Sequence, residues 1–199
     1  MKTFAVGLLS ALCLGAAPRP PAGQLRRAFE AAQAVLVDVE SKRGRGLGVR
    51  VGPSGEVITT VDAITLEEAS VKTASGASAA RVLFAQAHLG VALIQADAAG
   101  DFRATAVRTK PIDADTWLVG IAQSRAKRAR PSIGRVLKAP AAEAAFFETD
   151  LALPRGSIVF DAEGRFVGVV LSKSSRGARV TWVHAIREQL AATLSQSTL

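Results

Sequence analysis

The fold is decided by residues 44–64, which read GRGLGVRVGPSGEVITTVDAI. Glycines alternate with larger residues at the start of this stretch, and two apolar runs, 49–51 and 57–60, flank the segment Gly52-Pro53-Ser54-Gly55. Short apolar runs on both sides of a segment rich in glycine and proline are typical of a β-hairpin. The stretch therefore predicts two antiparallel strands joined by a turn at 52–55.

The rest of the chain continues this pattern of short strands. Upstream, valines recur at every second position between residues 35 and 39, which predicts a strand, and residues 24–34 carry apolar side chains at helical spacing. Further strands are expected over 68–73, 80–84, 91–95, 104–108, 116–121, 132–137, 145–149, 158–160, 166–172 and 179–183. A turn is expected at 76–80, and a closing helix over 185–194 has Ile186, Leu190 and Leu194 on one face. Many short strands with helices only at the ends predict an all-β fold, either a sandwich or a pair of barrels, divided near residues 98–103.

Residues 1–17 have the layout of a secretory signal peptide. Lys2 precedes an apolar run over 4–14, which is followed by small residues and then by prolines. The run is too short to cross a bilayer. We therefore expect an exported protein, periplasmic or secreted, that is cleaved between residue 16 and residue 22 and keeps no membrane span. An uncleaved helix that touches a membrane is the alternative.

Composition limits the chemistry of the mature chain. The 199 residues are 49% apolar and only 5% aromatic, so the core is expected to consist of Val, Leu, Ile and Ala. The single cysteine, Cys13, follows Leu12, which does not suit a lipoprotein signal, and we expect it to be removed with residues 1–17. No His/Cys/Asp cluster has metal-ligand spacing, so neither a metal nor another cofactor is expected. The glycine-rich run over 44–48 is followed by a strand and lacks the Lys-Ser/Thr of a phosphate-binding loop.

The chain is basic, with a formal net charge of +8. Part of this charge is concentrated in one cluster: Arg125, Lys127, Arg128, Arg130, Arg135 and Lys138. A basic cluster can bind an anionic polymer. This one has no interleaved aromatic residues on which bases could stack, so a solvated loop between two strands is the competing interpretation.

Residues 44–64 resemble, without a gap, the opening of trypsin-type serine proteases of the HtrA/DegP-like branch, where Gly-x-Gly-x-Gly leads through a turn to a Thr and then to the catalytic His. Residues 89–94, LGVALI, resemble the family's Asp-Leu-Ala-Leu-Leu strand, and residues 148–169 resemble its nucleophile region. The resemblance implies two six-stranded antiparallel barrels with a terminal helix. It divides a domain over 24–199 into a first lobe at about 35–98, a second at about 104–184 and a helix at 185–194. No peptide-binding module is expected after that helix.

The three positions that match the family's catalytic triad carry unsuitable residues. Asp62 stands at the position of the catalytic His, Gly90 at that of the Asp, and Arg155 at that of the nucleophilic Ser. A serine hydroxyl needs a base to take its proton, and a carboxylate with a pKa near ~4 is a poor base at neutral pH. The loop Pro154-Arg155-Gly156-Ser157 is also shorter than the family's loop, and the backbone N–H donors of an oxyanion hole depend on the shape of that loop.

Ser157 and His88 are the fallback pair for an active enzyme. With a gap in the alignment Ser157 becomes the nucleophile, and His88 lies two residues before Gly90. The other histidine, His184, is expected to cap the closing helix or to face solvent. From the replaced triad we expect a catalytically inactive protease homologue that binds polypeptides or an envelope component. The alternatives are an atypical serine endopeptidase that uses Ser157, and a basic binder of anionic polymers.

Overall fold

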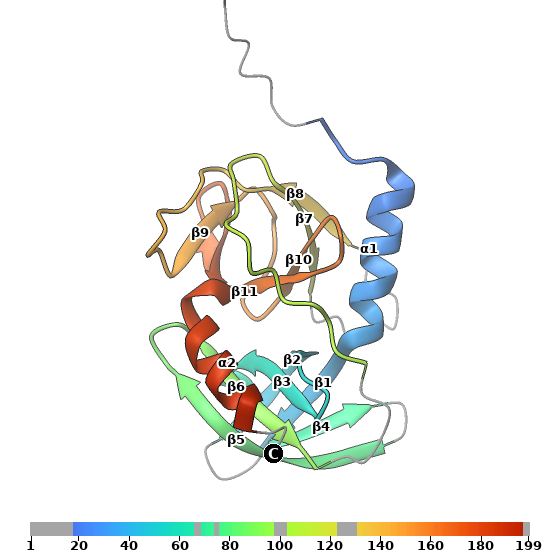
Figure 1. Ribbon diagram of the computed structural model, residues 1–199, viewed down its shortest axis with the longest axis vertical. Helices are drawn as coiled ribbons and strands as arrows, with labels where there is room; N and C mark the ends of the chain where they lie inside the picture. Colours follow the sequence, from blue (N-terminus) through green and yellow to red (C-terminus); the bar gives the residue numbers. More distant parts are fainter. Residues whose placement is uncertain (1–17, 66–68, 74–75, 98–102, 123–130, 197–199) are drawn as a thin grey trace, which may run out of the picture.

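The computed structural model describes residues 18–65, 69–73, 76–97, 103–122 and 131–196. Twelve strands form two six-stranded antiparallel sheets, and helices α1 (Ala22–Val35) and α2 (Arg187–Gln196) stand near the two ends of the chain (Figure 1). The predicted all-β fold with two barrels and two short helices is confirmed. Residues 1–17, to which the signal peptide is assigned, lie outside the described residues. No helix in the described part of the chain is long and apolar enough to cross a membrane.

The first barrel is a closed sheet in the order β1-β2-β3-β6-β5-β4. Its strands are β1 (Leu36–Ser41), β2 (Gly44–Arg50), β3 (Glu56–Thr60), β4 (Ala69–Thr73), β5 (Gly76–Gln86) and β6 (Val91–Ala96). The predicted hairpin is confirmed, since Val49 of β2 pairs with Ile58 of β3. Pairing of β1 with β4, for example Asp38 with Lys72, closes the barrel.

The second barrel is a six-stranded sheet in the order β8-β7-β10-β11-β12-β9. Its strands are β7 (Trp117–Ile121), β8 (Ser132–Arg135), β9 (Phe146–Thr149), β10 (Ile158–Asp161), β11 (Phe166–Ser174) and β12 (Gly177–Trp182). An isolated antiparallel bridge between Val136 and Thr149 joins the two outer strands, so this sheet also curls round on itself.

The alternating glycines of residues 44–48 allow close packing inside the first barrel. A Cβ atom at Gly48 would overlap Cγ1 of Val57, and one at Gly46 would lie 2.6 Å from the Cβ of Ala63. No real side chain fits in such spaces. Gly46 therefore lets the 3-10 turn η1 (Val61–Ala63), which carries Asp62, pack directly on β2.

One hydrophobic cluster unites the two barrels. It includes Val49 and Leu93 of the first barrel, Phe160 and Trp182 of the second, and Leu190 of α2. Helix α1 also bridges the barrels, because it contacts β7 and β10 of the second barrel and then runs into β1 of the first. Its buried face follows helical spacing: Leu25, Ala28, Ala32 and Val35.

Two local predictions were wrong. Residues 104–108 do not form an extended strand, because their backbone crosses between the barrels. Thr105 N–H donates to the Arg50 carbonyl of β2, whereas Val107 forms a single parallel bridge to Phe166 of β11. Residues 76–80, expected as a turn, begin β5 instead, because their pairing with β4 outweighs their small, polar character. The closing helix is preceded by a 3-10 turn, η2 (Val183–Ile186), and Ile186 and Leu190 are buried as expected.

Candidate functional site

Asp62 lies on η1, immediately after β3, with its side chain half exposed. The carbonyl of Gly90 accepts a hydrogen bond from the N–H of Val61 at 3.2 Å, so the turn before β6 is tied to η1. Two of the three positions that match the family's triad are therefore held together by the backbone of the first barrel.

Gly90 faces the second barrel. Its φ is +70°, and a Cβ atom at this position would lie 2.5 Å from Cδ1 of Leu171 on β11 and 4.0 Å from Nη2 of Arg155. The position thus adjoins Arg155 and β11 of the second barrel, but its backbone conformation favours glycine. It offers no side chain that could orient a base.

Arg155 completes the group from the second barrel. Its Nε donates to Oδ2 of Asp62 at 2.5 Å, and its Nη1 donates to the carbonyl oxygen of Leu171 at 3.1 Å. The structure therefore brings the three positions together, in what we call the inter-lobe cluster: Asp62, Gly90 and Arg155. A carboxylate–guanidinium ion pair across the two barrels stands at its centre.

The fallback nucleophile is enclosed. Ser157 is only 1% exposed, and its hydroxyl donates to the carbonyl of Pro154 at 2.7 Å. His88 is exposed on the turn before β6, and among the described residues no hydrogen bond or ion pair joins it to Ser157. The arrangement gives the serine hydroxyl no base.

The loop from residue 153 to residue 157 offers few free backbone donors. Pro154 has no N–H, and the N–H groups of Leu153, Gly156 and Ser157 donate to the carbonyls of Leu151, Val170 and Pro154. An oxyanion hole of the usual kind needs convergent free donors. Within this described loop, Arg155 is the only residue whose N–H group does not donate to a backbone carbonyl.

A pocket of about 320 Å³ lies directly beside this loop. We call it the Pro154 pocket, and its lining residues are Ala152, Leu153, Pro154, Lys173, Ser174 and Gly177. Its walls are mainly apolar, and Lys173 supplies a positive charge. Neither this pocket nor the role of Leu171 could be predicted from the sequence, because nothing in the residues of β11 marks them.

The basic cluster is only partly described. Arg125, Lys127, Arg128 and Arg130 lie outside the described residues. Arg135 is already engaged, because its Nη1 lies 3.1 Å from Asp115 and its guanidinium lies 5.6 Å from the centre of the Trp117 ring. Lys138 is exposed. Arg135 is thus already bound by Asp115 and Trp117, whereas Lys138 faces solvent.

His184 is packed more closely than expected. Its ring stacks on Trp182, with 4.4 Å between ring centres, and burial, with a further contribution from the charge of Arg187, lowers the pKa of its imidazole. Within the part of the chain that the structure describes, its Nδ1 has no hydrogen-bond partner. Among the described residues no group of His, Cys, Asp and Glu could hold a metal ion.

The ion pair between Asp62 and Arg155 should couple the two barrels measurably but weakly. Both side chains are half exposed, and exposed pairs contribute about 0.2–1 kcal/mol. We expect a coupling free energy of about 0.5–1 kcal/mol from a double-mutant cycle with Asp62→Ala and Arg155→Ala, measured by urea unfolding and reduced by salt. Arg26 and Glu30, exposed and 3.7 Å apart, form the control pair. Zero coupling for Asp62 and Arg155 would mean that the pair does not form in solution.

Comparison with known proteins identifies the fold. The chain is similar to a serine endoprotease from Yersinia pestis, with a TM-score of 0.71 and 16% identity, over 88% of this chain and 68% of that one. It is also similar to the HtrA-type protease AlgW, solved with a tripeptide, with a TM-score of 0.71 and 14% identity, over 89% of this chain and 64% of that one. No protein-family model and no curated protein matches the sequence. The double-barrel fold implied by the resemblance is therefore confirmed, and activity has to be argued from the site.

Proposed function

Because the chain has the fold of HtrA-type serine proteases, we propose that it is a catalytically inactive protease homologue that binds polypeptides outside the cytoplasm. The single observation that carries this proposal is the ion pair between Asp62 and Arg155. By the sequence resemblance, these two residues stand where the family has its base and its nucleophile.

The chemistry of this pair supports inactivity. A guanidinium remains protonated at any physiological pH and has no lone pair with which to attack a carbonyl. The carboxylate of Asp62 is already bound to Arg155. Ser157, which has the only hydroxyl in the loop over 153–157, is buried and donates to a carbonyl.

Two features beside the inter-lobe cluster support polypeptide binding. Among the described strands, residues 172–174 of β11 pair with β12 alone, so one backbone edge lies next to the Pro154 pocket. A free strand edge recruits an extended peptide by backbone hydrogen bonds, and a neighbouring apolar pocket selects a side chain. Lys173 at the pocket favours a ligand with a carboxylate near that side chain.

The binding proposal can be tested by filling the pocket. We expect the full chain to bind fluorescein-labelled, reduced and carboxymethylated α-lactalbumin, which stays unfolded, and not to cleave it. Ala152→Trp places a large ring in the Pro154 pocket and should weaken binding at least about 10-fold, or about 1.4 kcal/mol. Ala152 is exposed, so the fold should tolerate the change.

Ala79→Trp is the matched control, because Ala79 is exposed on β5 of the first barrel and does not line the pocket. Fluorescence anisotropy measures the affinity, and electrophoresis of the same samples detects cleavage. A dissociation constant above about 1 mM for the wild-type chain would contradict polypeptide binding. If Ala152→Trp and Ala79→Trp lowered the affinity equally, the Pro154 pocket would not be the binding site.

Export rests on the signal-like pattern of residues 1–17. Expression of the full chain in a bacterium with an outer membrane should yield a shortened protein in the periplasm or the medium. The new N-terminus should lie between residues 17 and 23, and intact mass spectrometry reads it directly. A full-length protein that stays in the cytoplasm would contradict export.

A further inference from the structure

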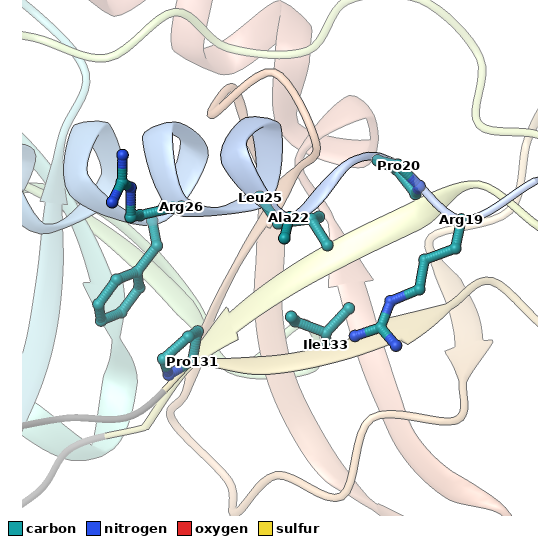
Figure 2. A pocket seen from close by; sticks show the side chains of 8 residues that line it. Arg19, Pro20, Ala22, Leu25, Arg26, Pro131 and Ile133 are labelled. Atoms are coloured by element: carbon teal, nitrogen blue, oxygen red, sulfur yellow. The ribbon is translucent and has the colours of Figure 1, made fainter.

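A second, larger concavity lies between α1 and β8, on the second barrel. We call it the α1–β8 groove, and Figure 2 shows it from close by. Its cavity volume is about 660 Å³, and it shares no residue with the inter-lobe cluster or the Pro154 pocket. The polypeptide-binding function proposed above does not use it.

The floor of the groove is apolar. Leu25 and Phe29 of α1 line it together with Pro131, which directly precedes β8, and Ile133 of β8. Leu25 is buried in the small cluster that holds α1 on the second barrel, and Phe29 and Ile133 pack against that cluster while remaining partly exposed. An apolar floor of this kind gains free energy when an apolar side chain covers it.

Two arginines line the groove, Arg19 before α1 and Arg26 on its second turn. In Figure 2 the guanidinium of Arg19 lies beside Ile133, whereas that of Arg26 is turned away from Pro131 and Ile133, so the exposed Arg26 side chain has to swing toward the groove to pair with a ligand there. No acidic residue lines the described groove. Arg26 is exposed, and its ion pair with Glu30 spans 3.7 Å between exposed groups, which solvent screens. The guanidinium of Arg19 lies 5.9 Å from the centre of the Trp117 ring, and among the described residues no carboxylate forms an ion pair with it.

From this arrangement we propose that the α1–β8 groove binds a polypeptide segment of a partner protein in which an apolar side chain is flanked by carboxylates. The apolar side chain covers Leu25, Phe29 and Ile133, and the carboxylates pair with Arg19 and Arg26. Guanidinium groups bind carboxylates in a two-pronged geometry, which gives the site a preference for acidic over amide side chains.

Charge decides between the possible occupants. A second copy of this chain carries a net charge of +8, so two copies repel each other at long range. A nucleic acid needs a row of cations along its phosphates. Among its described lining residues, this groove has only two cations, Arg19 and Arg26, and an apolar floor. An acidic, partly apolar segment of another protein meets both features.

The proposal is tested with the chain from residue 18 onward and the peptide Glu-Asp-Leu-Phe-Leu-Asp-Glu-amide, which carries fluorescein on its N-terminus. Arg19 belongs to the exported chain only when cleavage falls at residue 16 or 17, and a new N-terminus at residue 23 would remove it and overturn the proposal. A second peptide replaces each acid by its amide. We expect the acidic peptide to bind at least about 10-fold more tightly than the amide peptide, and to weaken as salt is raised through the physiological range. Equal binding of the two peptides would overturn the proposal.

Charge reversal at neighbouring positions of α1 gives a matched control. Arg26→Glu should lower the affinity for the acidic peptide about 10-fold, whereas Arg27→Glu, which makes the same change of charge on an exposed residue outside the groove, should lower it less than about 2-fold. Arg19→Glu lies before the helix and should have the same effect as Arg26→Glu without altering α1 itself. Equal effects of Arg26→Glu and Arg27→Glu would show unspecific attraction and contradict the site.

Two further measurements distinguish the α1–β8 groove from the Pro154 pocket and from self-association. Ala152→Trp, which fills the Pro154 pocket, should leave binding of the acidic peptide unchanged. Binding at the α1–β8 groove can therefore be measured whether or not the Pro154 pocket binds polypeptides. Light scattering of the chain alone should show a monomer, and Arg26→Glu should not change the measured mass. A dimer that dissociates in Arg26→Glu is the opposite result. Such a dimer would make a second copy the occupant and overturn the proposal.

Discussion

Replacing Asp161 by alanine should lower the free energy of unfolding by about 3–5 kcal/mol. Its carboxylate is fully buried at the end of β10 and accepts hydrogen bonds from Nη1 of Arg108 at 3.1 Å and from Nε of Arg165 at 2.7 Å. It also accepts hydrogen bonds from the backbone N–H groups of Glu163 and Arg165, each at 3.0 Å, and so fixes the turn between β10 and β11.

The large cost comes from what Asp161→Ala leaves behind. The Arg108 side chain is only 11% exposed, and its Nε finds no hydrogen-bond partner among the described residues. Without Asp161 a buried guanidinium loses its counter-charge, which costs far more than an exposed ion pair contributes. The matched control is Glu163→Ala, which removes the half-exposed second partner of Arg165 and should cost less than about 1 kcal/mol. Urea unfolding of both variants measures the difference, and similar losses would contradict this view of the turn.

An acid at Gly90, the position that the resemblance matches to the family's catalytic Asp, should destabilise the protein as well. Gly90→Asp places a side chain at φ +70° and brings its Cβ to 2.5 Å from Cδ1 of Leu171. The backbone conformation costs about 1–3 kcal/mol for a residue with a Cβ, and Leu171 must also move. We expect a total loss of about 2–4 kcal/mol and no gain of hydrolytic activity.

Gly156→Ala separates the cost of the backbone conformation from the cost of overlap with a neighbouring side chain. Gly156 has φ +83°, but the nearest atom to its Cβ position is Cγ2 of Thr60 at an ordinary 3.7 Å. This variant therefore measures the backbone contribution alone, about 1–2 kcal/mol, and should cost less than Gly90→Asp. The double variant Gly90→Asp, Leu171→Ala removes the overlap with Leu171. It should therefore regain part of the free energy of unfolding that Gly90→Asp loses beyond the backbone contribution. A Gly90→Asp protein as stable as wild type would contradict the packing described at this position.

The sequence of residues 44–64 was sufficient to predict the hairpin and, through the resemblance, the double barrel. Alternating glycines and a turn rich in proline and glycine are local signals, and the structure uses them locally: Gly48 is a glycine because Val57 leaves no room for a Cβ. The misread segments depend on distant partners. Residues 104–108 bond to both barrels, and residues 76–80 become a strand only because β4 lies beside them.

The site could be predicted only in part. The residues at the three triad positions were readable from the sequence, but the contact between Asp62 and Arg155 joins residues 93 positions apart on different barrels. Their opposite charges were the one available signal. The carbonyl of Leu171, which accepts a hydrogen bond from the guanidinium of Arg155, belongs to the backbone and leaves no mark in the sequence.

Covalent labelling tests the central claim, catalytic inactivity, most directly. A fluorophosphonate probe reacts with activated serine hydroxyls, and intact mass spectrometry detects the adduct. We predict no adduct on the wild-type chain under conditions that fully label an active trypsin-type protease, and the same result for Ser157→Ala, because the Ser157 hydroxyl is buried and bound to the carbonyl of Pro154. A stoichiometric adduct that disappears in Ser157→Ala would contradict the account and make the chain an active serine hydrolase.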